Sequence, residues 1–163
     1  MNLIKTITID DYFAEDDAIK LSNVVANLKF SEHEFGKQID NFNMVSNDAS
    51  ELFSRVLGKN LTVIDELSGI FRYPKHFIHF ESFNDTNEWL FVVALQNSTF
   101  NIFEHQTGNK NALTEHKFNY RNLLEWNLTV NYLLQPGQGI LFRPWLFHSF
   151  DNGLIQMFKL TEN

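Results

Sequence analysis

Apolar and polar residues alternate along the last two thirds of the chain with the period of two that is typical of β-strands. Turn-forming residues separate many of these stretches, for example Pro136-Gly137 and the run from Asp151 to Gly153. Many short strands at near-regular spacing predict a β-sandwich or a β-barrel. The predicted strands cover residues 61–72, 76–83, 88–95, 99–105, 128–134, 139–142 and 154–160.

The first part of the chain has a mixed pattern. Residues 3–9 alternate like a strand, and the acids at positions 15–17 suit the N-terminus of a helix. Apolar residues then recur at helical spacing as far as position 28. A second helix is predicted from Asp48, where a sequence similar to a capping box precedes an apolar face, to a stop at Gly58.

Neither a repeat nor a linker divides the 163 residues, a length that suits one domain. We therefore expect a single domain over residues 1–163, with residues 1–60 as a mixed helical and strand buttress and residues 61–163 as the β core. Some strands are apolar on both faces, as in residues 91–95, so one face needs a cover. The predicted helices provide this cover. The predicted fold class is mainly β with N-terminal helices, built as a jelly roll.

The charge balance limits the partners that the chain can bind. A net charge of −7 argues against a nucleic-acid partner, which needs a basic surface. Lysine and arginine are thinly spread, and no apolar run approaches the ~20 residues of a membrane-spanning helix, so we expect no membrane partner. The absence of cysteine excludes disulfides and thiolate chemistry. The first residues lack the pattern of a signal peptide, which predicts a cytoplasmic protein.

Three residues, His79, Glu81 and His148, are of the types that bind metal ions in proteins. His79 and Glu81 lie two positions apart in a predicted strand, so both point to one face. Ile78 and Phe80 then point to the other face. His148 follows another predicted strand near the C-terminus. Two imidazoles and one carboxylate on one side of a metal leave open coordination positions, the arrangement used in non-haem Fe(II) and O₂ chemistry.

The residues that lead to His148 resemble a known superfamily. A strand, the Pro136-Gly137 turn, a second strand and a bend precede this histidine. The order resembles the L-x-P-G-D-x-L-x-x-P-x-x-x-H ending of cupins and of Fe(II)/2-oxoglutarate-dependent oxygenases, with Gln138 at the acid position. The upstream His79-Phe80-Glu81 resembles their His-x-Asp. Residues 9–13, which precede the acid-started helix, also resemble the first segment of small prolyl-hydroxylase-like oxygenases.

This resemblance implies a double-stranded β-helix of the cupin type, with Fe(II) held by His79, Glu81 and His148. It also implies that 2-oxoglutarate chelates the metal and that O₂ is used to hydroxylate a C–H bond of a small molecule or of a peptide side chain. The far carboxylate of 2-oxoglutarate then requires a basic residue, because a buried carboxylate needs a charged partner. Lys159 lies near the position that prolyl-hydroxylase-like members use, and Arg143 is a second candidate.

Other interpretations of the same residues stay open. The glutamate in the His-x-acid motif and the lack of an Arg-x-Ser pattern favour a cupin-like binding or structural domain without 2-oxoglutarate chemistry. A third interpretation, between the oxygenase and the binding domain, is a metal-dependent cupin enzyme that does not use 2-oxoglutarate. An ion pair between Arg143 and Glu81 would instead make the acid structural. The remaining histidines considered, His76, His105 and His116, are assigned to surface or strand-end positions.

Overall fold

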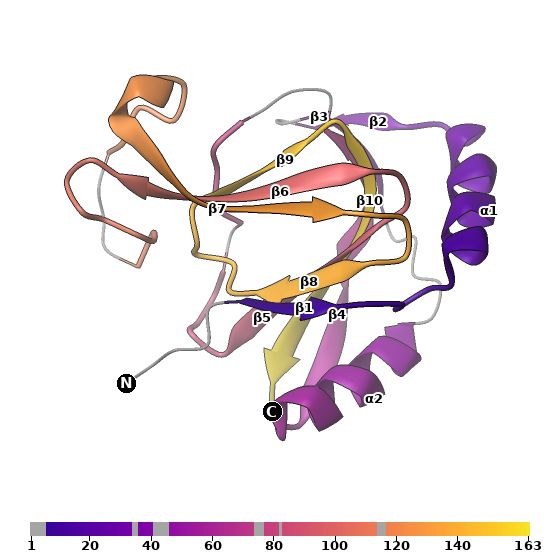
Figure 1. The fold of residues 1–163 in the computed structure, drawn as a ribbon. Coiled ribbons are helices and arrows are strands. Elements are labelled where there is room, and N and C mark those ends of the chain that lie inside the picture. Colours follow the sequence, from indigo (N-terminus) through magenta and orange to yellow (C-terminus); the bar gives the residue numbers. More distant parts are fainter. Residues whose placement is uncertain (1–5, 34–35, 41–45, 74–76, 82, 114–116) are drawn as a thin grey trace.

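Two antiparallel sheets form most of the structure (Figure 1). The computed structural model describes residues 6–33, 36–40, 46–73, 77–81, 83–113 and 117–163. In spatial order, the larger sheet contains β1 (Thr6–Ile9), β8 (Gly139–Phe142), β5 (Glu88–Ala94), β10 (Gly153–Glu162), β4 (Leu61–Tyr73), β3 (Gly36–Asp40) and β2 (Ser31–His33). The smaller sheet contains β7 (Trp126–Leu134), β6 (Ser98–His105) and β9 (His148–Asp151). Together with the helices below, these sheets give a mainly β fold of the jelly-roll type.

Helices α1 (Glu15–Ala26) and α2 (Ser46–Leu57) lie beside the larger sheet, away from the three-stranded sheet (Figure 1). The short 3₁₀ helix η1 (Leu123–Glu125) directly precedes β7 of the three-stranded sheet. Within the part of the chain that the structure describes, no helix is both long enough and apolar enough to cross a membrane.

The inner core lies between the two sheets. Alternate residues of β5, β8 and β10 point inward and pack against residues of the smaller sheet. The residues that define this inner core are Leu90, Val92, Ala94, Phe100, Ile102, Leu134, Ile140, Phe142, Leu146, Phe150, Ile155 and Met157.

A second set of apolar residues, the outer core, covers the other face of the larger sheet. Phe53 of α2 is fully buried there, and its ring centroid lies 4.3 Å from that of Phe91 on β5. Helix α1 covers a neighbouring part of the sheet, where Val25 packs with Ile70 and Leu154. The outer core consists of Ala49, Phe53, Leu61, Trp89, Phe91, Val93, Leu141, Phe158 and Leu160. Strands that are apolar on both faces thus have a partner on each side, as their sequences indicate.

Several sequence predictions for local structure are confirmed. Helix α1 begins at Glu15, and three acids occupy its first turn, where they favour the positive end of the helix dipole. Helix α2 begins two residues before the predicted start at Asp48, and Gly58 follows it with a φ of 63°. The side chain of Asp48, with which the predicted capping box begins, lies outside the described part of the structure. Positions 3–5 of the first predicted strand also lie outside it.

The strand predicted over residues 76–83 is wrong in form. Among its described residues, 77–81 and 83, only an isolated bridge occurs, between His79 and His148. Residues 76 and 82 lie outside the described part. The sequence pattern also missed β2, β3 and β9, because their sequences SEH, GKQID and HSFD lack alternating apolar residues. Strands β1, β2 and β3 join the larger sheet, so the N-terminal region contributes strands as well as helices.

We predict that Phe53→Ala lowers the free energy of unfolding by about 3–5 kcal/mol, because it opens a cavity between α2 and the sheet. Val56, on the same helix, is 41% exposed. Val56→Ala should therefore change stability by less than about 1 kcal/mol. Urea unfolding of the two variants and the wild type, followed by circular dichroism, measures both values. Equal losses in the two variants would contradict the packing of α2 described above.

Candidate metal centre

A two-way backbone contact joins the two histidines that the sequence singled out. The N–H of His79 donates to the carbonyl oxygen of His148 at 2.9 Å, and the N–H of His148 donates to the carbonyl oxygen of His79 at 2.8 Å. Their ring centroids are 4.4 Å apart. Residues directly opposite each other in an antiparallel pair carry their side chains on the same face. The bridge therefore brings the two imidazoles together although they are far apart in the sequence.

Backbone carbonyl groups orient both imidazole rings. Nδ1 of His79 lies 2.9 Å from the carbonyl oxygen of Phe77, and Nδ1 of His148 lies 2.7 Å from that of Leu146. A carbonyl oxygen can only accept, so each Nδ1 carries a proton and each neutral ring keeps its lone pair on Nε2. Such a second contact typically fixes the orientation of histidines that bind metals.

Glu81 completes the group. Its Oε1 lies 3.3 Å from Nε2 of His79, and its backbone N–H donates to the carbonyl oxygen of Pro144 at 2.9 Å. One ligand-type atom from each of His79, Glu81 and His148 lies within 4.8 Å of the others. Ile78 and Phe80 point the other way, into a cluster with Phe147. The alternation expected for residues 78–81 thus holds, although they do not form a regular strand.

His148 lies in an apolar environment that keeps it neutral. It is fully buried, and its ring centroid is 4.9 Å from that of Phe142, 5.5 Å from Phe150 and 5.8 Å from Phe100. Burial, together with the neighbouring His79, lowers the pKa of His148 to about 3. Its Nε2 is buried and has no hydrogen-bond partner among the described residues.

These features fit a metal ion. A buried nitrogen that lacks a hydrogen-bond partner carries a desolvation cost, which coordination to a cation would remove. Two neutral imidazoles and one carboxylate also match the donor set of non-haem Fe(II) sites. The residues His79, Glu81 and His148 are therefore able to hold a divalent transition metal on one side and leave its other side open.

Searches of family models and of curated proteins found no match to this chain. Many solved structures do match. HygX from Streptomyces hygroscopicus, with nickel and 2-oxoglutarate bound, matches over 96% of this chain and 82% of its own, at a TM-score of 0.61 and 10% identity. The epimerase SnoN from nogalamycin biosynthesis, in complex with Fe³⁺, α-ketoglutarate and nogalamycin RO, matches over 96% of this chain and 78% of its own, at a TM-score of 0.65 and 9% identity.

The α-ketoglutarate-dependent carbocyclase SnoK, also from nogalamycin biosynthesis, matches over 97% of this chain and 78% of its own, at a TM-score of 0.62 and 12% identity. These likenesses extend over almost the whole chain and concern the fold. This chain has the 2-oxoglutarate oxygenase fold. The jelly roll that the residues around His148 led us to expect is thus confirmed at the level of the fold.

Within this 2-oxoglutarate oxygenase fold, Lys159 points into the interior. It shares one face of β10 with Ile155 and Met157 of the inner core, because alternate residues of a strand point the same way. Its side chain is 5% exposed, and its Nζ lies 2.9 Å from Oε2 of Glu88. Lys159 therefore occupies the side of the sheet on which His148 packs, and it forms an ion pair there.

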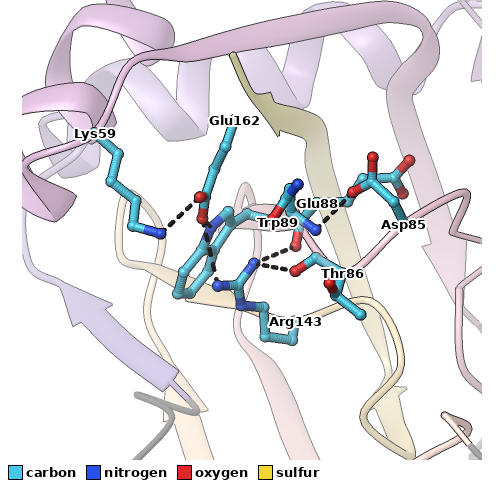
Figure 2. Close-up of polar contacts among 8 residues, drawn as sticks. Lys59, Asp85, Thr86, Glu88, Trp89, Arg143 and Glu162 are labelled. Atoms are coloured by element: carbon cyan, nitrogen blue, oxygen red, sulfur yellow. Dashed lines mark hydrogen bonds and ion pairs between the residues drawn. The ribbon is translucent and has the colours of Figure 1, made fainter.

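Arg143 lies on the opposite side of the sheet, beside Trp89 of the outer core. Figure 2 shows its polar contacts. Its guanidinium donates to the carbonyl oxygens of Thr86 and Glu88 at 3.0 and 2.9 Å. It also lies over the ring of Trp89, 3.5 Å from the centroid, and Trp89 belongs to the outer core. The ion pair that Arg143 forms here is with Glu162, at 3.4 Å. These contacts favour a structural role for Arg143, and of the two basic candidates Lys159 is the one on the inner face of the sheet.

Glu162 contacts Arg143, Lys59 and Trp89, and we call these four residues the outer cluster. Its carboxylate accepts from Lys59 Nζ at 2.6 Å and from Trp89 Nε1 at 2.8 Å, in addition to the contact with Arg143 (Figure 2). Burial raises the pKa of Glu162, but the contacts with Lys59, Trp89 and Arg143 outweigh this effect and leave the pKa below its ordinary value. The cluster ties the end of β10 to the segment that follows β8.

Glu88 and His105 differ from what the sequence pattern predicted. Glu88 is 2% exposed and pairs with Lys159, a contact that depends on the register between β5 and β10. The sequence signal that could have found Glu88 is its spacing of two residues from Leu90, which places both side chains on the same face of β5. His105 ends β6 as expected but is 9% exposed, and its Nε2 lies 3.6 Å from Oε2 of Glu125. The assignments of His76 and His116 lie outside the described residues.

We predict that Arg143→Ala lowers the free energy of unfolding by about 2–4 kcal/mol, because charged hydrogen bonds to buried carbonyl groups are lost. Metal binding should be unchanged in this variant. Arg55→Ala is the matched control, since Arg55 pairs with Glu51 at the surface and both side chains are 72% exposed. The control should change stability by less than about 1 kcal/mol. Loss of metal binding in a folded Arg143→Ala protein would contradict the structural role.

Proposed function

We propose that this chain is an Fe(II)- and 2-oxoglutarate-dependent oxygenase that hydroxylates a small molecule or a peptide side chain. The observation that carries the proposal is the convergence of His79, Glu81 and His148, whose ligand-type atoms lie within 4.8 Å of one another. The fold adds support, because HygX, SnoN and SnoK share it and are described with a metal, with 2-oxoglutarate or as dependent on it.

Each residue of the centre has a defined task in this proposal. His79 and His148 hold Fe(II) through Nε2, and the carbonyl groups of Phe77 and Leu146 keep both rings in the binding orientation. Glu81 contributes the negative charge that partly balances the metal. Bound Fe(II) and 2-oxoglutarate together supply the oxidising chemistry by which O₂ hydroxylates a C–H bond.

The surroundings of His148 serve the same chemistry by excluding water. The rings of Phe100, Phe142 and Phe150 enclose its imidazole, and water exclusion strengthens electrostatic contacts and limits side reactions. Lys159 is the candidate for the far carboxylate of 2-oxoglutarate, because it is the cation that β10 carries on its inner face.

A small-molecule substrate is the narrower form of the proposal. HygX has been crystallised with hygromycin B and SnoN with nogalamycin RO, both together with a metal and 2-oxoglutarate. Each of these structures matches 96% of this chain. A peptide side chain stays the other substrate class.

A second candidate function is a cupin-like binding domain without 2-oxoglutarate chemistry. The buried ion pair between Lys159 and Glu88 favours it, because the charge of the lysine is already balanced by a residue of the chain itself. The metal-loaded protein should bind a 2-oxo acid if it is an oxygenase, and should not bind one if it is a binding domain.

We predict that His148→Ala lowers affinity for Mn(II) or anaerobic Fe(II) by at least about 100-fold, more than the loss of a merely supporting residue causes. His105→Ala is the matched control, since His105 is also buried and has a carboxylate nearby at 3.6 Å. Isothermal titration calorimetry measures the affinity, and circular dichroism verifies the fold. Unaltered metal affinity in folded His148→Ala would rule out the ligand set.

We also predict a weak visible charge-transfer band when Fe(II) and 2-oxoglutarate are both added to the protein without oxygen. Neither addition alone should produce it. In Lys159→Ala, the band should need about tenfold more 2-oxoglutarate or more, because its far carboxylate then meets the buried Glu88 without the lysine that balances this charge. Iron affinity should stay the same. No band and no measurable iron binding in the wild type would leave the binding-domain candidate instead.

A further inference from the structure

Glu88 and Lys159 form an ion pair inside the fold. Oε2 of Glu88 lies 2.9 Å from Nζ of Lys159, and the two side chains are 3% and 5% exposed. The backbone N–H of Asn84 donates to Oε1 of Glu88 at 3.1 Å. Both carboxylate oxygens of Glu88 therefore have a positive or donor partner, and the lysine charge is balanced before any ligand arrives.

The register of the sheet places this pair on the side of the candidate metal centre. Lys159 lies opposite Leu90 in the pairing of β10 with β5, and Glu88 points the same way as Leu90 because it lies two residues away on the same strand. Leu90 is in turn opposite Phe142 of β8, whose ring contacts His148. Glu88 and Lys159 are thus diagonal neighbours on the inner face.

We propose that Glu88 is a specificity-determining residue for the 2-oxo acid, because it competes with the far carboxylate of 2-oxoglutarate for Lys159. This inference rests on the proposed function. Glu88 weakens the binding of 2-oxo dicarboxylates. It leaves the binding of 2-oxo acids with an uncharged tail unaffected, since these need no cation at that end.

The physical reason is the charge balance of a buried site. A second carboxylate beside the pair would place two negative charges against one positive charge where little water can screen them. The dicarboxylate must either displace Glu88 from Lys159 or accept this repulsion. A 2-oxo monocarboxylate brings no charge to that position, so only its metal-binding end contributes to electrostatics.

The test compares 2-oxoglutarate with 2-oxopentanoate, which has the same carbon chain but lacks the second carboxylate. Affinities are measured by calorimetry on the Mn(II)-loaded protein. In the wild type, 2-oxoglutarate should bind no more than about threefold more tightly than 2-oxopentanoate, because Glu88 cancels most of the attraction of Lys159. A preference above about tenfold, as an unbalanced lysine would give, overturns the inference.

Glu88→Gln provides the second arm, because it removes the competing charge and nearly preserves the shape. It should bind 2-oxoglutarate about tenfold more tightly than the wild type or better, with 2-oxopentanoate unchanged. Glu104→Gln is the matched control, since Glu104 is a half-buried glutamate on another strand that pairs with Lys110 at 3.5 Å. The control should leave both affinities unchanged.

The outcomes separate the inference from the function on which it rests. If the wild type binds no metal, the proposed function fails and the inference fails with it. If the wild type binds metal and 2-oxoglutarate but Glu88→Gln binds 2-oxoglutarate no more tightly, the inference alone is wrong. Should Glu88→Gln not fold, the ratio of the two affinities in the wild type still decides the question.

Discussion

The antiparallel contact between His79 and His148 is the constraint on which the candidate centre depends. Its two backbone hydrogen bonds, at 2.9 and 2.8 Å, are made between a short irregular segment and the first residue of β9. Because such paired residues share a face, the contact converts a motif of two distant sequence segments into one cluster of nitrogen and oxygen atoms. Glu81 joins it by strand-like alternation, without a regular strand.

Buried charge is balanced within the chain on both faces of the larger sheet. Lys159 pairs with Glu88 on the inner face, and Arg143 pairs with Glu162 on the outer face. The two systems meet at Glu88, whose side chain binds Lys159 while its carbonyl oxygen accepts from Arg143. Arg143 therefore holds the backbone of Glu88, whose carboxylate balances the charge of Lys159 on the inner face.

The sequence predicted those features that depend on local pattern. The acids at the start of α1, the glycine after α2 and the long strands β4, β5 and β6 all carry strong periodic or capping signals. Strands β2, β3 and β9 contain too few apolar residues for such a signal, and the segment around His79 has no regular partner strand. These elements form because of contacts with distant parts of the chain.

The sequence by itself determined the jelly-roll class, the residue types of the centre and the shared direction of His79 and Glu81, because alternation and turn chemistry act over a few residues. The tertiary structure decided which side of the sheet each charged side chain faces and which partner it meets. The sequence offered Lys159 as the first basic candidate and Arg143 as the second, and the structure shows that Lys159 points to the inner core while Arg143 stacks on Trp89. Only the register between β5 and β10, set by packing over the whole sheet, brings Glu88 to Lys159.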